Sequence, residues 1–268
     1  HNFSIAIFPE GTRSKTSEIH RFHKGAIFLA AQLNLPIVPV YLHGNAEVMP
    51  KGDFIAYNGM LNVHVGEAIE PQDDTFGKTV SERTRRISQH FKKTFTEIRL
   101  QNEDENYFYQ KLLLNYLYKE GNLIRHIKSD FQKNKHLYYK LFKDVPPKAH
   151  IAHITDDFGQ VDFLLVHQFA SRKVTTFNLI ESHRDISRAS YIVYKFRVNY
   201  VDQIEQLWDS QDVLLITKIN LSDIKIPPHI QKIIVLQANI SEKFIGFSIV
   251  REESNYVIYQ RNEKDETI

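Results

Sequence analysis

The sequence predicts an α/β protein built from two compact units. Its 268 residues are enough for two domains of ordinary size. In the second half, short β-rich segments alternate with segments that can form helices, which is the pattern of a layered fold with a parallel sheet. The polar, unpatterned stretch 102–106 separates two helical segments. We therefore expect an α/β domain over residues 1–101, a linker with leading helices over 102–147, and a second α/β domain over 148–268.

The composition supports folded domains and excludes several kinds of site. Hydrophobic residues make up 42% of the chain and aromatic residues 12%, which is enough for a core. The absence of cysteine excludes a disulfide scaffold, a zinc–thiolate site and a cysteine nucleophile. No run approaches the length of a membrane-spanning helix. The chain starts at His1 inside an apolar run, so we interpret it as a piece of a longer polypeptide.

The charge is concentrated in the middle of the chain. Residues 78–148 carry 16 basic and 8 acidic side chains. This basic region can face the phosphates of a lipid surface or of a nucleic acid, or it can form well-solvated helices. The sequence contains no recognition motif of the DNA- or RNA-binding modules, so we expect no nucleic-acid partner.

Hydrophobic patterning places the elements of the first domain. Residues 3–8 are typical of a strand, 23–33 of a helix, and 36–42 and 61–65 of two further strands. A long helix is predicted to begin at Ser81, since its apolar residues recur at a period of 3.6; they are Ile87, Phe91, Phe95 and Ile98.

The second half begins with two helices and continues with strands. Residues 106–119 and 122–143 are helical, with Gly121 as a plausible C-cap between them. The β-rich segments are 150–155, 174–180, 213–217 and 231–236. Two last runs, 245–251 and 256–261, predict an antiparallel hairpin at the end of the sheet.

Residues 8–14 read Phe-Pro-Glu-Gly-Thr-Arg-Ser and directly follow the first predicted strand. At a strand end, a glycine turn can present backbone N–H groups to an anion. The Thr12 hydroxyl adds a donor, and the Arg13 guanidinium can bind a phosphate through two hydrogen bonds. Glu10 can orient Arg13 or accept a hydrogen bond from a substrate hydroxyl. The motif thus predicts a phosphate site made of Glu10, Gly11, Thr12 and Arg13; the alternative is an ordinary polar turn with a surface arginine.

Three blocks together resemble the 1-acylglycerol-3-phosphate (lysophosphatidic acid type) acyltransferases. They are residues 8–14, residues 22–26 (Phe-His-Lys-Gly-Ala) and residues 37–40 (Ile-Val-Pro-Val), in the order and spacing of that family. The resemblance covers about residues 1–100 and corresponds to the C-terminal half of a partial acyltransferase α/β domain. It implies that the first block holds the glycerol phosphate of the acceptor. The substrate pocket that it implies contains Phe8, Pro9, Lys24, Gly25, Val38, Pro39 and Val40.

The family's catalytic block, His-x-x-x-x-Asp, belongs upstream of the phosphate block. Five positions after His1 stands Ala6. The later histidines follow the motif, and none has an aspartate five positions on; they are His20, His23, His43 and His64. In the family, that histidine is the general base on the acceptor hydroxyl, which attacks an acyl thioester. We therefore expect no catalytic residue in this chain, which should bind substrate at best.

The resemblance also implies partners and a location. The partners are the missing upstream half of the same polypeptide and a membrane surface that supplies lysophospholipid. The expected location is the cytoplasmic face of the membrane, to which the protein binds peripherally. An acyl thioester is the implied co-substrate, and no metal or cofactor is implied.

The second half resembles a class I methyltransferase, a Rossmann-like sheet with a terminal hairpin. That family has an Asp-x-Gly-x-Gly-x-Gly turn after its first strand, where glycines allow close approach of S-adenosylmethionine and the acid holds its amino end. Here His153 replaces the acid, and Thr155 and Asp157 replace two glycines, so that only Gly159 remains. Glu181 lies within one position of the acid that binds the ribose hydroxyls. We therefore expect S-adenosylmethionine not to bind, with Gly159 and Glu181 as the candidate cofactor residues if it does.

Asp156 and Asp157 are adjacent carboxylates on the predicted turn after residues 150–155. Neighbouring side chains on a turn point apart, so we interpret them as solvated rather than as an acid–base pair.

Three interpretations of the whole chain remain open. The first is part of an acyltransferase, inactive in this chain alone. The second is a non-catalytic binding or scaffold module with a decayed methyltransferase fold. The third is a divergent S-adenosylmethionine-dependent methyltransferase.

Overall fold

The computed structural model describes residues 4–14, 18–49, 54, 56, 60–169, 171–190, 197–218, 224–237 and 244–262. The chain folds as two compact units, His1–Asp104 and Glu105–Ile268, called unit 1 and unit 2 below. Within the described residues, no helix combines the length and the apolar character that crossing a membrane requires.

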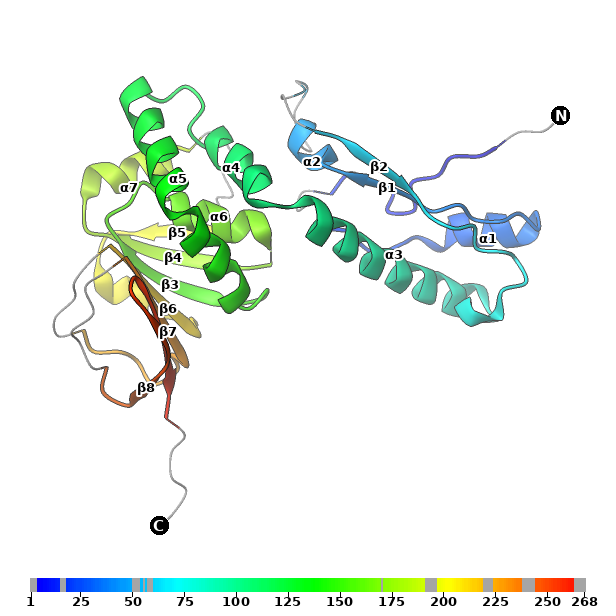
Figure 1. Ribbon diagram of the computed structural model, residues 1–268. Helices are drawn as coiled ribbons and strands as arrows, with labels where there is room; N and C mark the ends of the chain where they lie inside the picture. The colour runs from blue at the N-terminus through cyan, green and yellow to red at the C-terminus, as the bar shows by residue number, and fades with distance from the viewer. Residues whose placement is uncertain are drawn as a thin grey trace, which may run out of the picture. The chain divides into compact units, whose positions relative to one another are not determined.

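Unit 1 consists of a two-stranded antiparallel sheet and a long helix (Figure 1). The helix α3 begins after Thr79, whose hydroxyl accepts a hydrogen bond from the Glu82 amide, so it starts one residue before the predicted Ser81. The elements of unit 1 are α1 (Lys24–Gln32), β1 (Val40–His43), α2 (Asn45–Val48), β2 (Asn62–Val65), the 3-10 helix η1 (Asp74–Phe76) and α3 (Val80–Asn102).

The core of unit 1 is small, and only one face of its sheet is covered. The buried side chains are Phe22, Ile27, Ile69 and Ile87. Tyr41 of β1 packs against Phe91 of α3, with ring centroids 4.9 Å apart. On the opposite face, Val40 pairs across the sheet with Val65, and both are largely exposed. The apolar sheet face of Val38, Val40, Val63 and Val65 therefore faces solvent in the described structure.

The strand predicted at residues 3–8 does not form. The described part of it, residues 4–8, has no strand conformation, and Phe8 is 75% exposed. A strand needs a neighbour for its backbone N–H and C=O groups, and the two-stranded sheet of unit 1 contains only β1 and β2. The segment is apolar, as a strand would be, but the described residues supply no partner strand for it.

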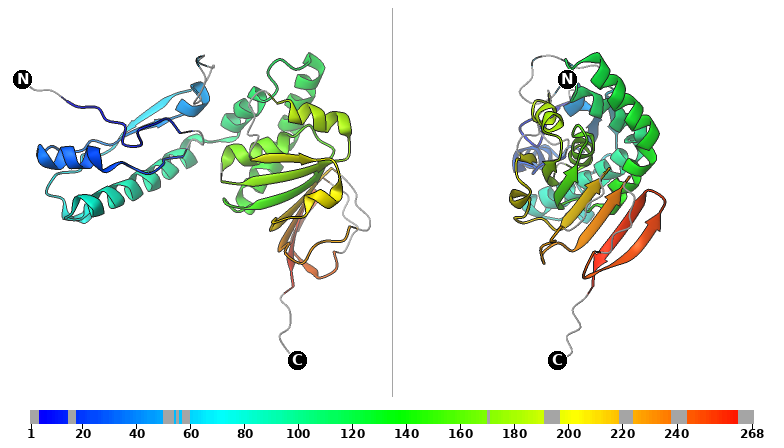
Figure 2. Two further views of the ribbon diagram at one scale, coloured as in Figure 1. Left: turned by 180° about the vertical axis from the view of Figure 1, so that it is seen from behind. Right: turned by 90° about the vertical axis from the view of Figure 1, so that its left-hand side faces the viewer.

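Unit 2 is built on a seven-stranded sheet with the order β5-β4-β3-β6-β7-β9-β8. The first five strands of that order run parallel, and β9 and β8 form an antiparallel hairpin at the edge (Figure 1 and Figure 2). Counted from β3 as the first strand, the parallel part has the order 3-2-1-4-5 of a Rossmann-like sheet. The strand order therefore confirms the predicted α/β fold with its terminal hairpin.

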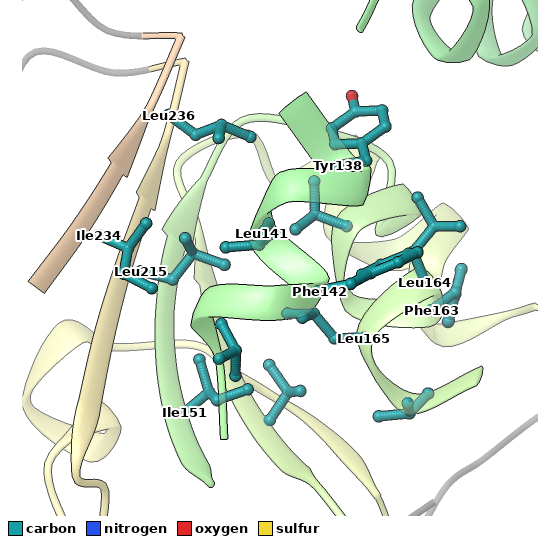
Figure 3. Close-up of a cluster of buried hydrophobic side chains, with 14 of the residues drawn as sticks. Tyr138, Leu141, Phe142, Ile151, Phe163, Leu164, Leu165, Leu215, Ile234 and Leu236 are labelled. Carbon is teal, nitrogen blue, oxygen red and sulfur yellow. The ribbon is translucent and has the colours of Figure 1, made fainter. Parts of the chain in front are cut away.

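Helices α4, α5 and α6 cover one face of this sheet, where Figure 3 shows side chains of α5 and α6 meeting those of the strands. The other face is covered by the 3-10 helix η2 and by residues 224–230, around Ile216 and Ile233. The elements of unit 2 are α4 (Glu105–Leu114), α5 (Gly121–Asp144), β3 (His150–Thr155), α6 (Gln160–Gln168), β4 (Lys173–Asn178), α7 (Glu181–Arg188), β5 (Val198–Val201), η2 (Ile204–Leu207), β6 (Val213–Thr217), β7 (Lys232–Leu236), β8 (Phe247–Glu253) and β9 (Tyr256–Arg261).

Two local expectations for unit 2 were wrong. Gly121 does not end a helix: it is the first residue of α5, and Tyr118 in the preceding turn has the positive φ of +65°. The four-residue strand β5 was not predicted. Its four residues, Val-Asn-Tyr-Val, are at the lower limit of length at which a strand pattern is informative.

Candidate functional site

The Phe8–Ser14 segment forms a tight turn that packs on the start of α1. The Gly11 amide donates to the Phe8 carbonyl at 3.0 Å, and the His23 amide donates to the Pro9 carbonyl at 2.7 Å. Gly11 has a φ of +69°, and a Cβ at this position would lie 3.2 Å from the His23 ring. Glycine is therefore required here by both conformation and space. The Gly11 amide is hydrogen-bonded within the turn. The sequence had suggested instead that this amide is presented outward to an anion.

Glu10 holds the neighbouring loop in the described structure. Its Oε2 accepts a hydrogen bond from the backbone N–H of His20 at 2.8 Å. The His20 ring lies 3.2 Å from the Ser14 hydroxyl, so a second contact joins the two segments. Glu10 thus positions the loop that follows the motif, a role that sequence reasoning missed.

Arg13 and Thr12 lie at the surface of unit 1. The Arg13 guanidinium donates to the Met49 carbonyl at 3.4 Å, which is a long, weak hydrogen bond. The exposed position of Arg13 leaves its guanidinium accessible to a ligand from solvent. The predicted role of both residues in phosphate binding stays a prediction.

The other predicted pocket residues lie on two separate elements. Lys24 and Gly25 start α1, where the Lys24 ammonium donates to the Ser81 hydroxyl at 2.9 Å and a Cβ on Gly25 would meet open space. Val38, Pro39 and Val40 lead into β1. Pro39 is buried and its carbonyl accepts from the Gly66 amide, whereas Val38 and Val40 are exposed. The structure brings the turn and the start of α1 together through His23.

A pocket of about 470 Å³ lies in unit 2. It sits at the carboxyl ends of β3 and β6, where the chain order of the parallel strands reverses, the usual ligand site of such sheets. Four elements line it: the first turns of α5 (Asn122, Leu123 and His126), the turn after β3 (Asp156, Asp157 and Phe158), α7 (His183 and Ile186) and Lys218 after β6. Sequence reasoning did not find this pocket, since no local spacing links these residues.

Asp157 is buried, contrary to the expectation of a solvated turn. Its side chain is 3% exposed, and its Oδ1 accepts from the Gly159 amide at 2.8 Å. Burial raises the pKa of Asp157 to about 6, with the Asp162 carboxylate adding to the rise and with His153 and Lys218 opposing it. The Asp157 carboxylate points inward because it accepts a hydrogen bond from the Gly159 amide and so caps the turn that leads into α6.

His153 occupies the interior beneath this turn. Its Nδ1 lies 2.6 Å from Oδ1 of Asp162, and its Nε2 contacts the hydroxyl of Thr217 at the end of β6. Burial acts to lower the pKa of His153, but the Asp162 carboxylate and its hydrogen bond outweigh that effect, and the pKa is raised above its ordinary value. A buried histidine with a raised pKa thus stands where the methyltransferase resemblance expected an acid.

Neither of the two candidate cofactor residues lines the pocket, although Gly159 directly follows Phe158, which does. Gly159 has a φ of +84°, and a Cβ there would lie 2.7 Å from the Tyr200 hydroxyl and 2.9 Å from the Ser187 hydroxyl. It allows close packing of the turn against β5 and α7. Glu181 begins α7 and accepts from the Arg184 guanidinium at 3.1 Å, with its own side chain 80% exposed.

His43, a further histidine of unit 1, has a structural partner. His43 lies 3.3 Å from a carboxylate oxygen of Glu103, which Arg99 also binds through two hydrogen bonds. Among the described residues, no group of three or more histidines, aspartates and glutamates has the arrangement of a metal site.

Comparison with known proteins relates the N-terminal segment to one family. Residues 1–43 match the family model described as Acyltransferase. This segment is acyltransferase-like. The chain is 44% identical over 59 residues to the chloroplastic 1-acyl-sn-glycerol-3-phosphate acyltransferase BAT2 of Brassica napus, a match that covers 22% of this chain and 16% of that protein.

Two further acyltransferase relatives come from a palm and a bacterium. The 1-acyl-sn-glycerol-3-phosphate acyltransferase of Cocos nucifera is 58% identical over 43 residues, which cover 16% of this chain and 14% of that protein. The enzyme of the same name from Pseudomonas aeruginosa is 29% identical over 94 residues, which cover 35% of this chain and 36% of that protein. The acyltransferase-like segment thus spans about a third or less of the length of these relatives.

Among solved structures, proteins similar to this chain include two at low sequence identity. The magnesium protoporphyrin IX methyltransferase of Synechocystis has 13% identity and a TM-score of 0.37, with 63% of this chain and 97% of that chain covered. The pyocyanin biosynthetic protein PhzM has 10% identity and a TM-score of 0.39, with 61% and 64% covered. The fold of unit 2 is established by its strand order rather than by these similarities.

Proposed function

We propose that unit 1 is the acceptor-binding half of an acyltransferase that moves an acyl group from a thioester to a lysophospholipid of the 1-acylglycerol-3-phosphate type. The observation that carries the proposal is the Phe8–Ser14 turn, which lies inside the segment that matches the acyltransferase family. Its shape is fixed by Gly11 and by Glu10, and its Arg13 side chain lies at the surface. A turn of fixed shape that carries an exposed arginine suits the binding of a phosphate.

In this proposal the chain supplies binding and orientation, not proton transfer. Arg13 binds the acceptor phosphate through two parallel hydrogen bonds, and Thr12 donates a third. The acceptor hydroxyl attacks the carbonyl carbon of the thioester, so that a C–O bond forms and the C–S bond breaks. A general base takes the hydroxyl proton and returns it to the departing thiolate. That base is the histidine of the upstream His-x-x-x-x-Asp block, with an acyl thioester as the co-substrate.

The uncovered sheet face supports the proposal that the upstream half of the same polypeptide is the first partner of unit 1. Val40 and Val65 form a cross-strand pair with 49% and 69% of their surface exposed, and Val38 and Val63 extend the same apolar face. An apolar sheet face is stable when another layer buries it. We propose that the upstream half supplies this layer.

The second proposed partner is a membrane surface on its cytoplasmic side, to which the protein binds peripherally. The basic region of residues 78–148 supports this, because exposed lysine and arginine side chains attract anionic lipid headgroups. No feature of the described residues favours a nucleic acid.

The test is calorimetric titration of the whole chain with glycerol 3-phosphate, with glycerol as the uncharged control. We expect saturable binding of glycerol 3-phosphate and none of glycerol. Arg13→Ala should weaken binding by about tenfold or more, because a bidentate charged pair is lost. Arg85→Ala, which removes an exposed arginine of α3, serves as the matched control and should bind as the unchanged chain does. Equal binding by the two variants would overturn the proposal.

For unit 2 we propose a non-catalytic module that does not bind S-adenosylmethionine. His153, paired with Asp162, cannot accept a hydrogen bond from the amino end of that cofactor as an acid would. Glu181 is paired with Arg184 at the surface, and Gly159 is closed off by Tyr200 and Ser187. The residues present therefore do not fit the cofactor in the manner of the methyltransferases.

Titration with S-adenosylmethionine tests this second proposal and the alternative of a divergent methyltransferase together. We expect no heat of binding at millimolar ligand. Saturable binding that Asp157→Asn or Glu181→Gln weakens would restore the methyltransferase alternative and overturn the proposal.

A further inference from the structure

The pocket of unit 2 is rich in hydrogen-bond acceptors. Asp156 lines it with a partly exposed side chain. His183, which also lines the pocket, donates from Nδ1 to the Asp156 carbonyl at 2.5 Å. Asp157 also lines the pocket, and its Oδ2 accepts no hydrogen bond from any residue in the described part of the chain. A buried carboxylate oxygen without a donor points to a donor supplied from outside.

Among the described residues that line the pocket, carboxylates outnumber the lysine and arginine cations. Lys218 lines the pocket, but its ammonium lies 2.6 Å from Oδ1 of Asp130, so this pair is neutral as a whole. The carboxylates of Asp156 and Asp157 then outnumber the lysine and arginine cations that line the pocket. Such a site attracts a positive ligand more than a negative one.

The remaining wall is aromatic and apolar. The Phe158 ring is partly exposed and lies against the His183 ring, with centroids 3.8 Å apart, and against the His126 ring at 5.4 Å. Leu123 and Ile186 complete this wall. An aromatic face next to a carboxylate is an arrangement that binds organic cations, through cation–π attraction together with a charged hydrogen bond.

We propose that this pocket binds a small organic ammonium ion. The ammonium group donates to Asp156, and the apolar body of the ligand packs against Phe158, Leu123 and Ile186. The pocket volume of about 470 Å³ falls within the range usual for small-molecule sites. The proposal concerns unit 2 alone, so it stands or falls independently of the acyltransferase proposal for unit 1.

The test compares benzylamine with benzyl alcohol, which have nearly the same shape and differ in charge. Both are titrated into the whole chain and followed by calorimetry. We expect benzylamine to bind at least about tenfold more tightly than benzyl alcohol, since only the cation gains from the carboxylate and the ring. Asp156→Asn should lower the affinity for benzylamine to that for benzyl alcohol. Phe158→Leu should also lower the affinity for benzylamine. Glu252→Gln, an exposed acid on the β8–β9 hairpin, is the matched control and should change nothing.

Several results would overturn the proposal. Equal affinities for the amine and the alcohol would show that charge is not recognised. No binding of benzylamine at millimolar concentration would show that the pocket takes no such ion. Full affinity in both Asp156→Asn and Phe158→Leu, with circular dichroism confirming that both variants fold, would place the amine elsewhere. Tight binding of S-adenosylmethionine that both substitutions weaken would identify a cofactor pocket instead.

Discussion

The imidazole of His153 and the carboxylate of Asp162 form a hydrogen-bonded pair that solvent does not reach, with Nδ1 and Oδ1 separated by 2.6 Å. On the other side of the ring, Nε2 contacts the Thr217 hydroxyl, which itself donates to the Thr155 hydroxyl at 3.1 Å. Burial acts to lower the pKa of His153, but the Asp162 carboxylate outweighs this effect and raises the pKa, which favours the imidazolium form of the ring. The pair ties strand β3 to helix α6 and to the end of β6.

Removing the carboxylate of this pair should strongly destabilise unit 2. We expect Asp162→Asn to lower the free energy of unfolding by about 3–5 kcal/mol, because it leaves a buried cation without its partner. Urea unfolding followed by the fluorescence of Trp208, the only tryptophan, measures this. Asp185→Asn, which removes an exposed carboxylate from α7, is the control and should cost less than about 1 kcal/mol.

The same pair predicts a pH dependence with a definite sign. Because the pKa of His153 is raised in the folded state, its stabilising contribution is fully present below the unfolded pKa of about 6.5 and is lost as the pH rises through the folded pKa. Asp162→Asn should flatten this fall. An unchanged pH profile in the variant would contradict the imidazolium assignment.

Asp157 should destabilise unit 2 at neutral pH. Burial raises its pKa from 3.8 to about 6, so the folded state binds more protons than the unfolded state between these values. Stability therefore falls as the pH rises through this interval and stays lower above it. We expect Asp157→Asn, which keeps an oxygen for the Gly159 amide, to be more stable than the unchanged chain by about 1–3 kcal/mol near pH 7.5. The difference should vanish below about pH 4.

Asp156→Asn is the matched control for this prediction, since it removes the adjacent carboxylate at a partly exposed position. Its stability should stay within about 0.5 kcal/mol of the unchanged chain. A variant Asp157→Asn that is less stable at neutral pH would show that the ionised carboxylate has a partner that holds it.

The strands of unit 2 could be predicted from the sequence because they are continuous apolar runs. Residues 150–155, 213–217 and 256–261 have the bounds expected, and strands buried on both faces show such runs. Residues 4–8 have the same apolar pattern without forming a strand. An apolar run predicts that a segment can form a strand. Whether the strand forms depends on a neighbouring strand that can pair with it, and the run itself does not identify that neighbour.

Of the candidate sites, too, only the part formed by neighbouring residues in the sequence could be predicted. The Phe8–Ser14 turn is a contiguous motif, so its chemistry could be read from the sequence. The contact of Glu10 with the His20 amide depends on how a loop folds back, and no spacing rule predicts it. The pocket of unit 2 joins Asn122 to Lys218 across four elements, so only the folded sheet brings its wall together.

The glycine at the start of α6 should be irreplaceable. Gly159 has a φ of +84°, and a Cβ would lie 2.7 Å from the Tyr200 hydroxyl. We expect Gly159→Ala to destabilise unit 2 by about 2 kcal/mol or more through backbone strain and this clash. Gly121→Ala is the matched control, since a Cβ there meets nothing within 4 Å in helix α5. It should leave stability unchanged or raise it by up to about 1 kcal/mol.

A second substitution separates strain from clash. Tyr200→Phe removes the hydroxyl that a Cβ on Gly159 would meet. Combined with Gly159→Ala, it should recover part of the lost stability in the same unfolding measurement. Strict additivity of the two substitutions would show that the clash with the Tyr200 hydroxyl does not make the glycine necessary.

The fully buried guanidinium of Arg172 joins the ends of two helices. It donates to the carbonyls of Phe142 and Val145 at the end of α5, to that of Leu165 in the last turn of α6, and to that of Pro146. The last carbonyls of a helix have no partner within it, so this side chain satisfies groups that would otherwise be buried without a donor.

Arg172→Met keeps most of the side-chain volume and removes every one of these hydrogen bonds. We expect it to destabilise unit 2 by about 3–5 kcal/mol, the cost of several buried carbonyls left without donors. Arg172→Lys should recover less than half of this loss, because one ammonium cannot reach carbonyls on both helices. Arg251→Met, which breaks a partly exposed pair with Asp144, is the control and should cost less than about 1 kcal/mol. If Trp208 fluorescence in urea gives equal midpoints for Arg172→Met and Arg251→Met, the junction of α5 and α6 does not depend on this side chain.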